Sequence, residues 1–378
     1  MRGERGALRI ENGVWATLTP AMLIRTSDAV KGMCRFLPSQ AGSATLERTM
    51  SESETRTSGA KSKPPATSAD GAAPSEAEAK AAVEPLTFRE KLEAGRFIVS
   101  VEVDPPHGLG ARKAIEGTRL LKEAGVDVIN VGDSPTAKIR MSPLAMSTLL
   151  MREVGVEIVM HYTTRDRNAM AIHSDMVGAH VLGIRNILCL RGDPPSVGGY
   201  TDIVGVWDVS AVGLMRFLKL LNDGVDFTGK SVGRQASFVI GGSANLNADP
   251  LEPELRLMRR KVEAGAHFFV TQNVFEEKKL ETFLDGAAKF KKPVIVGVLP
   301  LANSRHAEFL HNEVPGMFLP DKVRERMRKA GEERGPKEGQ AMARDTIALC
   351  REKAAGVYLV PSFGRYELVA ELVAELGR

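Results

Sequence analysis

The sequence predicts an α/β fold of the (β/α)8 barrel type (TIM barrel) over residues 86–378. Short apolar segments rich in β-branched residues alternate with segments of helical periodicity. The alternation repeats eight times in about 290 residues, which is the number and size of the strand–helix units of a barrel. Several predicted helices end at Ala-Gly directly before a strand, as at Ala124-Gly125 and Ala355-Gly356, which is typical of a glycine C-cap before a short loop. An open doubly wound sheet shows the same alternation, but eight strands favour the barrel.

Each predicted strand is a short apolar run, and each predicted helix carries apolar residues three or four positions apart. The strands are expected at 96–103, 126–131, 156–162, 186–191, 236–242, 267–272, 293–299 and 356–360. The helices between them are expected at 111–124, 143–154, 168–182, 209–222, 253–264 and 276–289, with helical segments between 303 and 353 and a last helix at 366–376. In such a barrel the carboxyl ends of all strands meet at one mouth, where a site would lie.

Composition excludes several classes of function. The net charge of +4 is small for 378 residues, and basic and acidic residues are interspersed, so no nucleic-acid partner is expected. No apolar run approaches the roughly 20 residues that span a bilayer. The three cysteines are far apart in the sequence, which favours a reducing compartment, and we expect a cytoplasmic protein. The histidines show no metal-ligand spacing with carboxylates, so no metal is expected.

Residues 1–85 are expected to form a disordered or poorly structured extension. Residues 50–84 contain almost no large apolar side chains and cannot bury enough surface to offset the entropy of ordering. Residues 1–49 are somewhat Arg-rich without strong periodicity. They are either a targeting peptide or an over-extended reading frame, with Met50 as the true start.

Polar residues follow or end every predicted strand. The best acid/base candidate is Glu102, because a carboxyl group in an apolar barrel mouth should keep its proton near neutral pH. The alternative role for Glu102 is a structural salt bridge. His161 could contact a ligand or be an internally satisfied hydrogen-bonding group. Gln272 offers a donor and an acceptor suited to the edge of a heterocycle, although an isolated glutamine is more often structural.

Arg191, Gly192 and Asp193 follow a run with the look of a buried strand. Burying an ionised side chain costs several kcal/mol unless it has a partner or ligand, so Asp193 is expected to be a buried site residue.

Two other motifs are rejected. Residues 224–231 match G-x-x-x-x-G-K-[ST], but a helix precedes them and a strand follows, the reverse of a phosphate-binding loop. The Gly-Leu-Gly at 108–110 lacks the third glycine of a dinucleotide fingerprint.

Several motifs in order resemble one family. V-E-V-D-P-P, M-H-Y-T-T-R-D-R-N, L-R-G-D-P-P, R-K-V-E-A-G-A, V-T-Q-N-V-F, G-V-L-P-L and H-N-E-V-P-G together are similar to the methylenetetrahydrofolate reductase family. The resemblance is greatest to the reductase half of bifunctional proteins that also carry a homocysteine methyltransferase domain. It covers residues 86–378. One difference is that the family's common F-F-P-P is Val103-Asp104-Pro105-Pro106 here.

The resemblance implies a barrel that binds FAD and reduces 5,10-methylenetetrahydrofolate to 5-methyltetrahydrofolate by ping-pong hydride transfer, with NADH or NADPH as the donor. Glu102 then corresponds to the general acid. The implied folate-contacting residues are Asp193, Gln272 and Arg365. The implied flavin-contacting residues are Asn130, His161, Arg191, Gly192, Asp193, Trp207, Asn245, Glu254 and Lys261. We also expect a homo-oligomer. The alternatives are a pterin-binding barrel methyltransferase, a reductase subunit that takes electrons from a partner protein, and a non-catalytic barrel.

Overall fold

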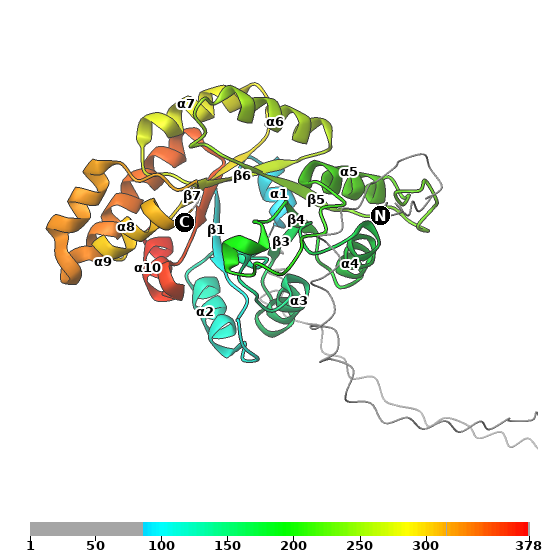
Figure 1. The fold of residues 1–378 in the computed structure, drawn as a ribbon, viewed down its shortest axis with the longest axis horizontal. Helices are drawn as coiled ribbons and strands as arrows, with labels where there is room; N and C mark the ends of the chain where they lie inside the picture. Colours follow the sequence, from blue (N-terminus) through cyan, green and yellow to red (C-terminus); the bar gives the residue numbers. More distant parts are fainter. Residues whose placement is uncertain (1–85, 315, 377–378) are drawn as a thin grey trace, which may run out of the picture. The chain divides into compact units, whose positions relative to one another are not determined.

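The computed structural model describes residues 86–314 and 316–376. In this part of the chain eight strands form a closed parallel barrel, in which each strand pairs with the next and β8 closes on β1 (Figure 1). The predicted fold class is confirmed. The extension expected over residues 1–85, with its alternative start at Met50, lies outside the described residues.

The elements follow the predicted order. The strands are β1 (Ile98–Val103), β2 (Val128–Val131), β3 (Ile158–Thr163), β4 (Asn186–Leu190), β5 (Val239–Ala244), β6 (Phe268–Asn273), β7 (Val294–Val298) and β8 (Gly356–Leu359). The α-helices are α1 (Phe88–Glu93), α2 (Arg112–Glu123), α3 (Pro143–Val154), α4 (Ala169–Val181), α5 (Ala211–Asn222), α6 (Glu252–Glu263), α7 (Glu277–Ala288), α8 (Ser304–Glu313), α9 (Asp321–Lys353) and α10 (Tyr366–Glu375). Short 3-10 turns are η2 (Pro135–Ala137), η3 (Pro195–Gly198) and η4 (Ser362–Gly364).

Alternate residues of each strand point into the barrel and fill it in layers. An apolar interior cluster takes one or two side chains from every strand, and it consists of Ile98, Val128, Val159, Leu188, Val239, Phe268, Val270, Ile295 and Tyr358, together with Phe88 of α1. The rings of Phe88 and Phe268 meet edge to face with centroids 5.1 Å apart. Gly241 makes room for Phe268, because a Cβ at Gly241 would lie 2.4 Å from that ring. The interior is therefore a packed core, and the polar groups of the mouth rest on it.

Helix α1 was not predicted from the sequence. It begins at a capping box, in which the Thr87 side chain accepts from the Glu90 backbone N–H and the Glu90 carboxylate accepts from the Thr87 backbone N–H. The backbone N–H of Phe88 donates to Glu157 Oε2 over 2.6 Å. These contacts hold Phe88 in the barrel interior, where it is fully buried.

Most elements lie within two residues of the predicted boundaries, and two regions differ more. The fifth strand begins at Val239, three residues later than expected. The helical segments expected between 303 and 353 are α8 and α9, and α9 bends at Gly331, whose φ of 70° is not helical.

Residues 224–231 form a turn bridged by Val225 and Ser231, in which Asp226 Oδ1 accepts from the backbone N–H groups of Thr228 and Lys230. The rejection of a phosphate-binding loop here is consistent with that geometry.

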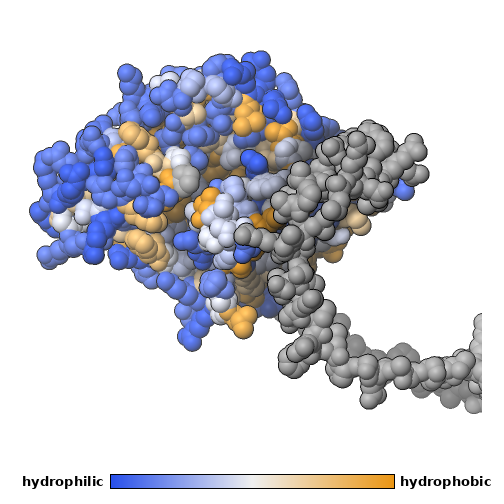
Figure 2. Space-filling model, in the orientation of Figure 1, coloured by the Kyte–Doolittle hydropathy of each residue, from blue (hydrophilic) through white to orange (hydrophobic). Residues whose placement is uncertain are grey.

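The outer surface over α8 and α9 is largely hydrophilic (Figure 2). Within the described ranges, no helix is both long and apolar enough to cross a membrane. In the same ranges, no group of three or more histidine, cysteine or acidic side chains is placed to hold a metal ion.

Candidate active site

Glu102 lies on β1 with its side chain at the barrel mouth. It is half-buried, and burial raises the pKa of its carboxyl group to about 8. The neighbouring Asp104 charge contributes to this rise, whereas the Tyr358 hydrogen bond and the Arg140 charge oppose it. A carboxyl group with this pKa is mostly protonated at neutral pH and can act as an acid.

Tyr358 lies between Glu102 and two other predicted residues, His161 and Asn130. The hydroxyl group of Tyr358, on β8, hydrogen-bonds to Glu102. The Tyr358 ring lies 5.9 Å from that of His161 on β3. His161 Nε2 lies 3.1 Å from Asn130 Oδ1 on β2, so that nitrogen carries the proton that Oδ1 accepts. Burial lowers the pKa of His161 to about 4, which keeps its imidazole neutral.

A cavity of about 450 Å³ opens beside Glu102. That volume is within the range of small-molecule sites. Its lining comes from the ends of β1 and β8 and from the loops and helices beside them: Glu102, Asp104, Pro105, Pro106, Gly110, Lys113, Ala114, Arg140, Val360, Pro361, Phe363, Gly364 and Tyr366. Phe363 is 66% exposed, and its ring contacts that of His306 at a tilt of 50°, with centroids 4.7 Å apart. The lining of this cavity thus includes both the protonated Glu102 carboxyl group and the exposed Phe363 ring.

The segment after β4 differs from the expectation. The strand ends at Leu190, and Gly192 has a φ of 84°, which turns the chain out of the barrel wall. Asp193 is therefore exposed rather than buried, and the expectation of a buried charge was wrong. Arg191 is also exposed, and its guanidinium carbon lies 4.6 Å from the centroid of the Trp207 ring, in cation–π contact.

Lys261 and Glu254 of α6 reach the end of β5. Lys261 is 4% exposed, its Nζ donates to the Ser243 backbone carbonyl, and it lies 4.0 Å from Glu254 Oε1. Burial lowers the pKa of Lys261, and the Glu254 charge opposes that shift. Asn245, just past β5, accepts a hydrogen bond from the Asn247 backbone N–H over 3.0 Å. These three predicted residues therefore lie at neighbouring positions around one strand end.

Gln272 and Arg365 occupy other parts of the mouth. Gln272, on β6, is exposed, and a Cβ at Gly316 would lie 3.3 Å from its side-chain nitrogen. Arg365 is exposed where η4 passes into α10. Burial, and secondarily the Arg365 charge, lowers the pKa of His306 to about 4. Arg365 thus lies near the His306–Phe363 ring pair at the edge of the Glu102 cavity.

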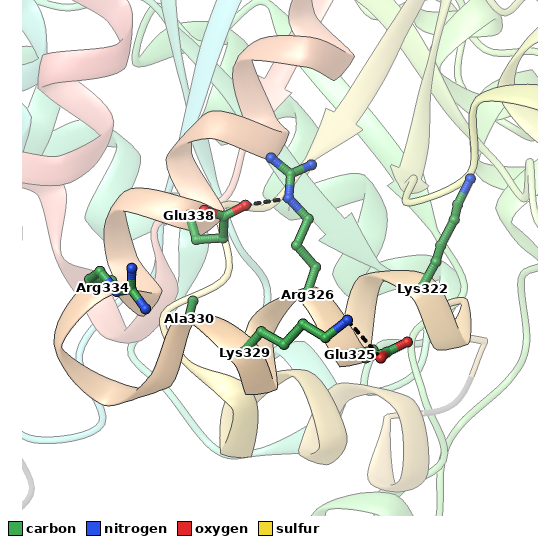
Figure 3. Close-up of a pocket in the computed structure, with 7 residues that line it drawn as sticks. All are labelled: Lys322, Glu325, Arg326, Lys329, Ala330, Arg334 and Glu338. Atoms are coloured by element: carbon green, nitrogen blue, oxygen red, sulfur yellow. Dashed lines mark hydrogen bonds and ion pairs between the residues drawn. The ribbon is translucent and has the colours of Figure 1, made fainter.

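A second cavity, of about 440 Å³, lies on α9 and contains none of the predicted site residues (Figure 3). Its seven lining residues come from the two arms of α9 on either side of Gly331: Lys322, Glu325, Arg326, Lys329, Ala330, Arg334 and Glu338. Ion pairs join Arg326 to Glu338 and Lys329 to Glu325. These pairs partly neutralise the hollow, which is best explained as a solvated bend between the two arms of the helix.

The family model for methylenetetrahydrofolate reductase matches residues 87–372. The chain belongs to the methylenetetrahydrofolate reductase family. The chain is 25% identical over 181 residues to methylenetetrahydrofolate reductase (NADH) 1 of Arabidopsis thaliana, which is 46% of this chain and 30% of that protein. It is 24% identical over 220 residues to the 5,10-methylenetetrahydrofolate reductase of Pectobacterium carotovorum, which is 57% of this chain and 67% of that protein.

A solved structure supports the fold of this family member. A Clostridium thermocellum protein that binds two copies of 5-methyl-5,6,7,8-tetrahydrofolic acid aligns with a TM-score of 0.55 at 12% identity, over 76% of this chain and 98% of that one. The aligned region spans only 28% to 34% of the length of three eukaryotic relatives, from Caenorhabditis elegans, Arabidopsis thaliana and Schizosaccharomyces pombe.

Three residues that the sequence did not indicate lie close to Glu102 or Asp104. Tyr358 hydrogen-bonds to Glu102, and Arg140 Nη2 lies 3.6 Å from Asp104 Oδ2. A Cβ at Gly132 would lie 3.4 Å from Glu102 Oε1. Strand alternation places Tyr358 on the same face as Gly356, but its position opposite Ser100 of β1 follows only from the closure of the barrel. Arg140 lies in a loop without a motif, so the sequence held no comparable signal for it.

Proposed function

We propose that the chain is a flavin-dependent reductase that converts 5,10-methylenetetrahydrofolate to 5-methyltetrahydrofolate with NADH or NADPH. The observation that carries this proposal is Glu102, a protonated acid at the edge of a ligand-sized cavity in a member of this family. The relatives include proteins named for NADPH and for NADH, so the choice of nicotinamide is left to experiment.

The residues around the mouth suit a flavin. His161 is neutral and hydrogen-bonds to Asn130, and exposed Arg191 lies against the Trp207 ring. Thr164 Oγ1 and Asn273 Oδ1, at the ends of β3 and β6, are buried without a hydrogen-bond partner among the described residues. Buried polar atoms are rarely left unpaired, so a polar ligand at the mouth would be favoured. A bound flavin would supply hydride transfer from the nicotinamide to the folate in two half-reactions.

The chain's own residues would bind and orient the folate and would donate a proton to it. The methylene bridge of the folate opens when one folate nitrogen leaves the methylene carbon. Glu102 would donate its proton to that leaving nitrogen. Tyr358 would hold the Glu102 carboxyl group in place. Three exposed side chains at the mouth would hydrogen-bond to the polar edge of the pterin and to the rest of the folate. They are Asp193, Gln272 and Arg365.

Flavin binding tests this proposal. The purified full chain is incubated with excess FAD, desalted, and examined for an absorbance band near about 450 nm, which belongs to the oxidised cofactor. We expect the band to be retained and to bleach anaerobically with NADH, NADPH or both. Failure to retain any flavin would contradict the proposal and favour a pterin-binding methyltransferase or a subunit that takes electrons from a partner.

Replacing Asp193 should affect folate more than flavin. Because the carboxylate is exposed in a loop, Asp193→Asn should leave the fold intact and raise the KM for folate about tenfold, the loss of one charged hydrogen bond. Steady-state kinetics and flavin content measure the two effects. Asp202→Asn, exposed in the same loop, is the control and should change neither. A flavin-free Asp193→Asn protein would show that the role of Asp193 is structural instead.

The other expectations from the sequence remain part of this proposal. A cytoplasmic location is one of them, and a homo-oligomeric state is another. Light scattering coupled to size-exclusion chromatography of the full chain measures the oligomeric state, and a monomer would contradict that expectation.

A further inference from the structure

A second carboxyl group lies beside Glu102. Asp104 follows β1 two residues after Glu102, and both side chains approach Gly132 at the end of β2. A Cβ at Gly132 would lie 2.8 Å from Asp104 Oδ1 and 3.4 Å from Glu102 Oε1. The two oxygens are therefore within about 6 Å of each other, the range in which one carboxylate disfavours ionisation of another.

Arg140 distinguishes the two acids. Its Nη2 lies 3.6 Å from Asp104 Oδ2, and its Nη1 donates to the Pro105 carbonyl over 3.2 Å, which fixes the guanidinium beside Asp104. The other oxygen of Asp104, Oδ1, is buried and has no hydrogen-bond partner among the described residues. Asp104 thus has a cation on one oxygen, and its unpaired oxygen is the one that approaches Gly132 near Glu102.

Three other titratable side chains of the described residues lie around the pair. Tyr358 of β8 hydrogen-bonds to Glu102, and Tyr366 of α10 and Lys113 of α2 line the same cavity. Burial raises the pKa of Tyr366 to about 12 and that of Tyr358 well above its usual value, so both hydroxyl groups stay neutral. Among the residues that line the cavity, the acids are Glu102 and Asp104 and the cations are Lys113 and Arg140.

We propose that Asp104, held as a carboxylate by Arg140, is a positioning residue that keeps the proton on Glu102. Burial raises the pKa of Asp104, but the Arg140 charge opposes this, whereas the hydrogen-bond partner of Glu102 is a neutral hydroxyl group. The negative charge of the pair therefore sits on Asp104, and its repulsion leaves Glu102 protonated and ready to donate. This inference rests on the proposed role of Glu102 in folate reduction. The motif resemblance places phenylalanine at this position in the family's common sequence, so Asp104 is a departure of this chain from that sequence.

The test removes the charge of Asp104 with an isosteric substitution and measures the protonation of Glu102 directly. Infrared spectra of the full chain without flavin or folate, recorded across pH, follow the carbonyl band of the protonated carboxyl group, and Glu102→Gln identifies the band by its loss. We expect Asp104→Asn to lower the pH midpoint of the Glu102 band by about one unit or more. Asp104→Glu, which keeps the charge, should restore the midpoint. Asp223→Asn removes an exposed carboxylate paired with Lys219 on α5 and should leave the midpoint unmoved.

An unchanged midpoint in Asp104→Asn would overturn the inference. If that variant does not fold, Asp104→Ser removes the same charge and gives the same test with the same sign. Its midpoint should also fall, and an unchanged midpoint would again overturn the inference. Because these titrations need no cofactor or substrate, they remain decisive if the chain binds no flavin. If it does reduce folate, the high-pH loss of activity in Asp104→Asn should move down with the infrared midpoint.

Discussion

The Glu102→Gln variant should lose folate reduction by at least about a hundredfold, the typical contribution of a general acid. It should still oxidise NADH or NADPH with an artificial electron acceptor, because only the folate half-reaction needs the proton. The side chain keeps its size and its place beside Tyr358, so flavin content should be unchanged. Steady-state assays of both half-reactions measure the difference. Glu116→Gln, an exposed change on α2 beside Arg112, is the matched control and should affect neither.

The Glu102 carboxyl group also predicts how the rate of folate reduction by the wild type depends on pH. The pKa of Glu102 is raised to about 8, so the proton is present below that pH and is lost as pH rises through it. Folate reduction should therefore decline above about pH 8 while the artificial-acceptor reaction does not. Equal loss of both reactions in Glu102→Gln, or a folate rate that stays flat through this range, would contradict the acid role.

The Phe268→Ala variant should lower the free energy of unfolding by about 3–5 kcal/mol, the cost of deleting a fully buried aromatic side chain. Phe268 meets Phe88 edge to face and fills the space left by Gly241, so the interior cannot easily collapse around the cavity. Urea denaturation measures the change. Phe309→Ala, with a side chain 51% exposed on α8, should cost no more than about 0.5 kcal/mol. Equal destabilisation by both variants would show that the barrel interior is not the main source of stability.

The barrel was predictable because its signals are local. Strand alternation, helical periodicity and glycine C-caps each depend on a few neighbouring residues, and together they gave all eight strands in order. Helix α1 was missed because six residues are too few for a periodic pattern. Its capping box, Thr87 with Glu90, was the readable signal.

The site was predictable in part. Glu102, His161 and Gln272 were singled out as polar residues in apolar runs, and Asn130 through the family resemblance. The structure places Glu102, His161 and Asn130 close together, with Tyr358 between Glu102 and His161, and leaves Gln272 exposed elsewhere at the mouth. That arrangement depends on Tyr358, whose position opposite Ser100 follows from the closure of β8 on β1 and cannot be read locally. The burial of Asp193 was predicted wrongly because the apolar run gives no sign that the positive φ of Gly192 turns the chain outward. The link of Arg140 to Asp104 joins two loops 36 residues apart and has no sequence pattern.

The central claim is that this chain reduces methylenetetrahydrofolate with a proton from Glu102. It is tested most directly by incubating the full chain with FAD, 5,10-methylenetetrahydrofolate and either NADH or NADPH under anaerobic conditions, with 5-methyltetrahydrofolate quantified by mass spectrometry. We expect product from the wild type with at least one nicotinamide and almost none from Glu102→Gln. Flavin-loaded wild type that forms no product with either nicotinamide, or a Glu102→Gln variant that forms it at the wild-type rate, would contradict the claim.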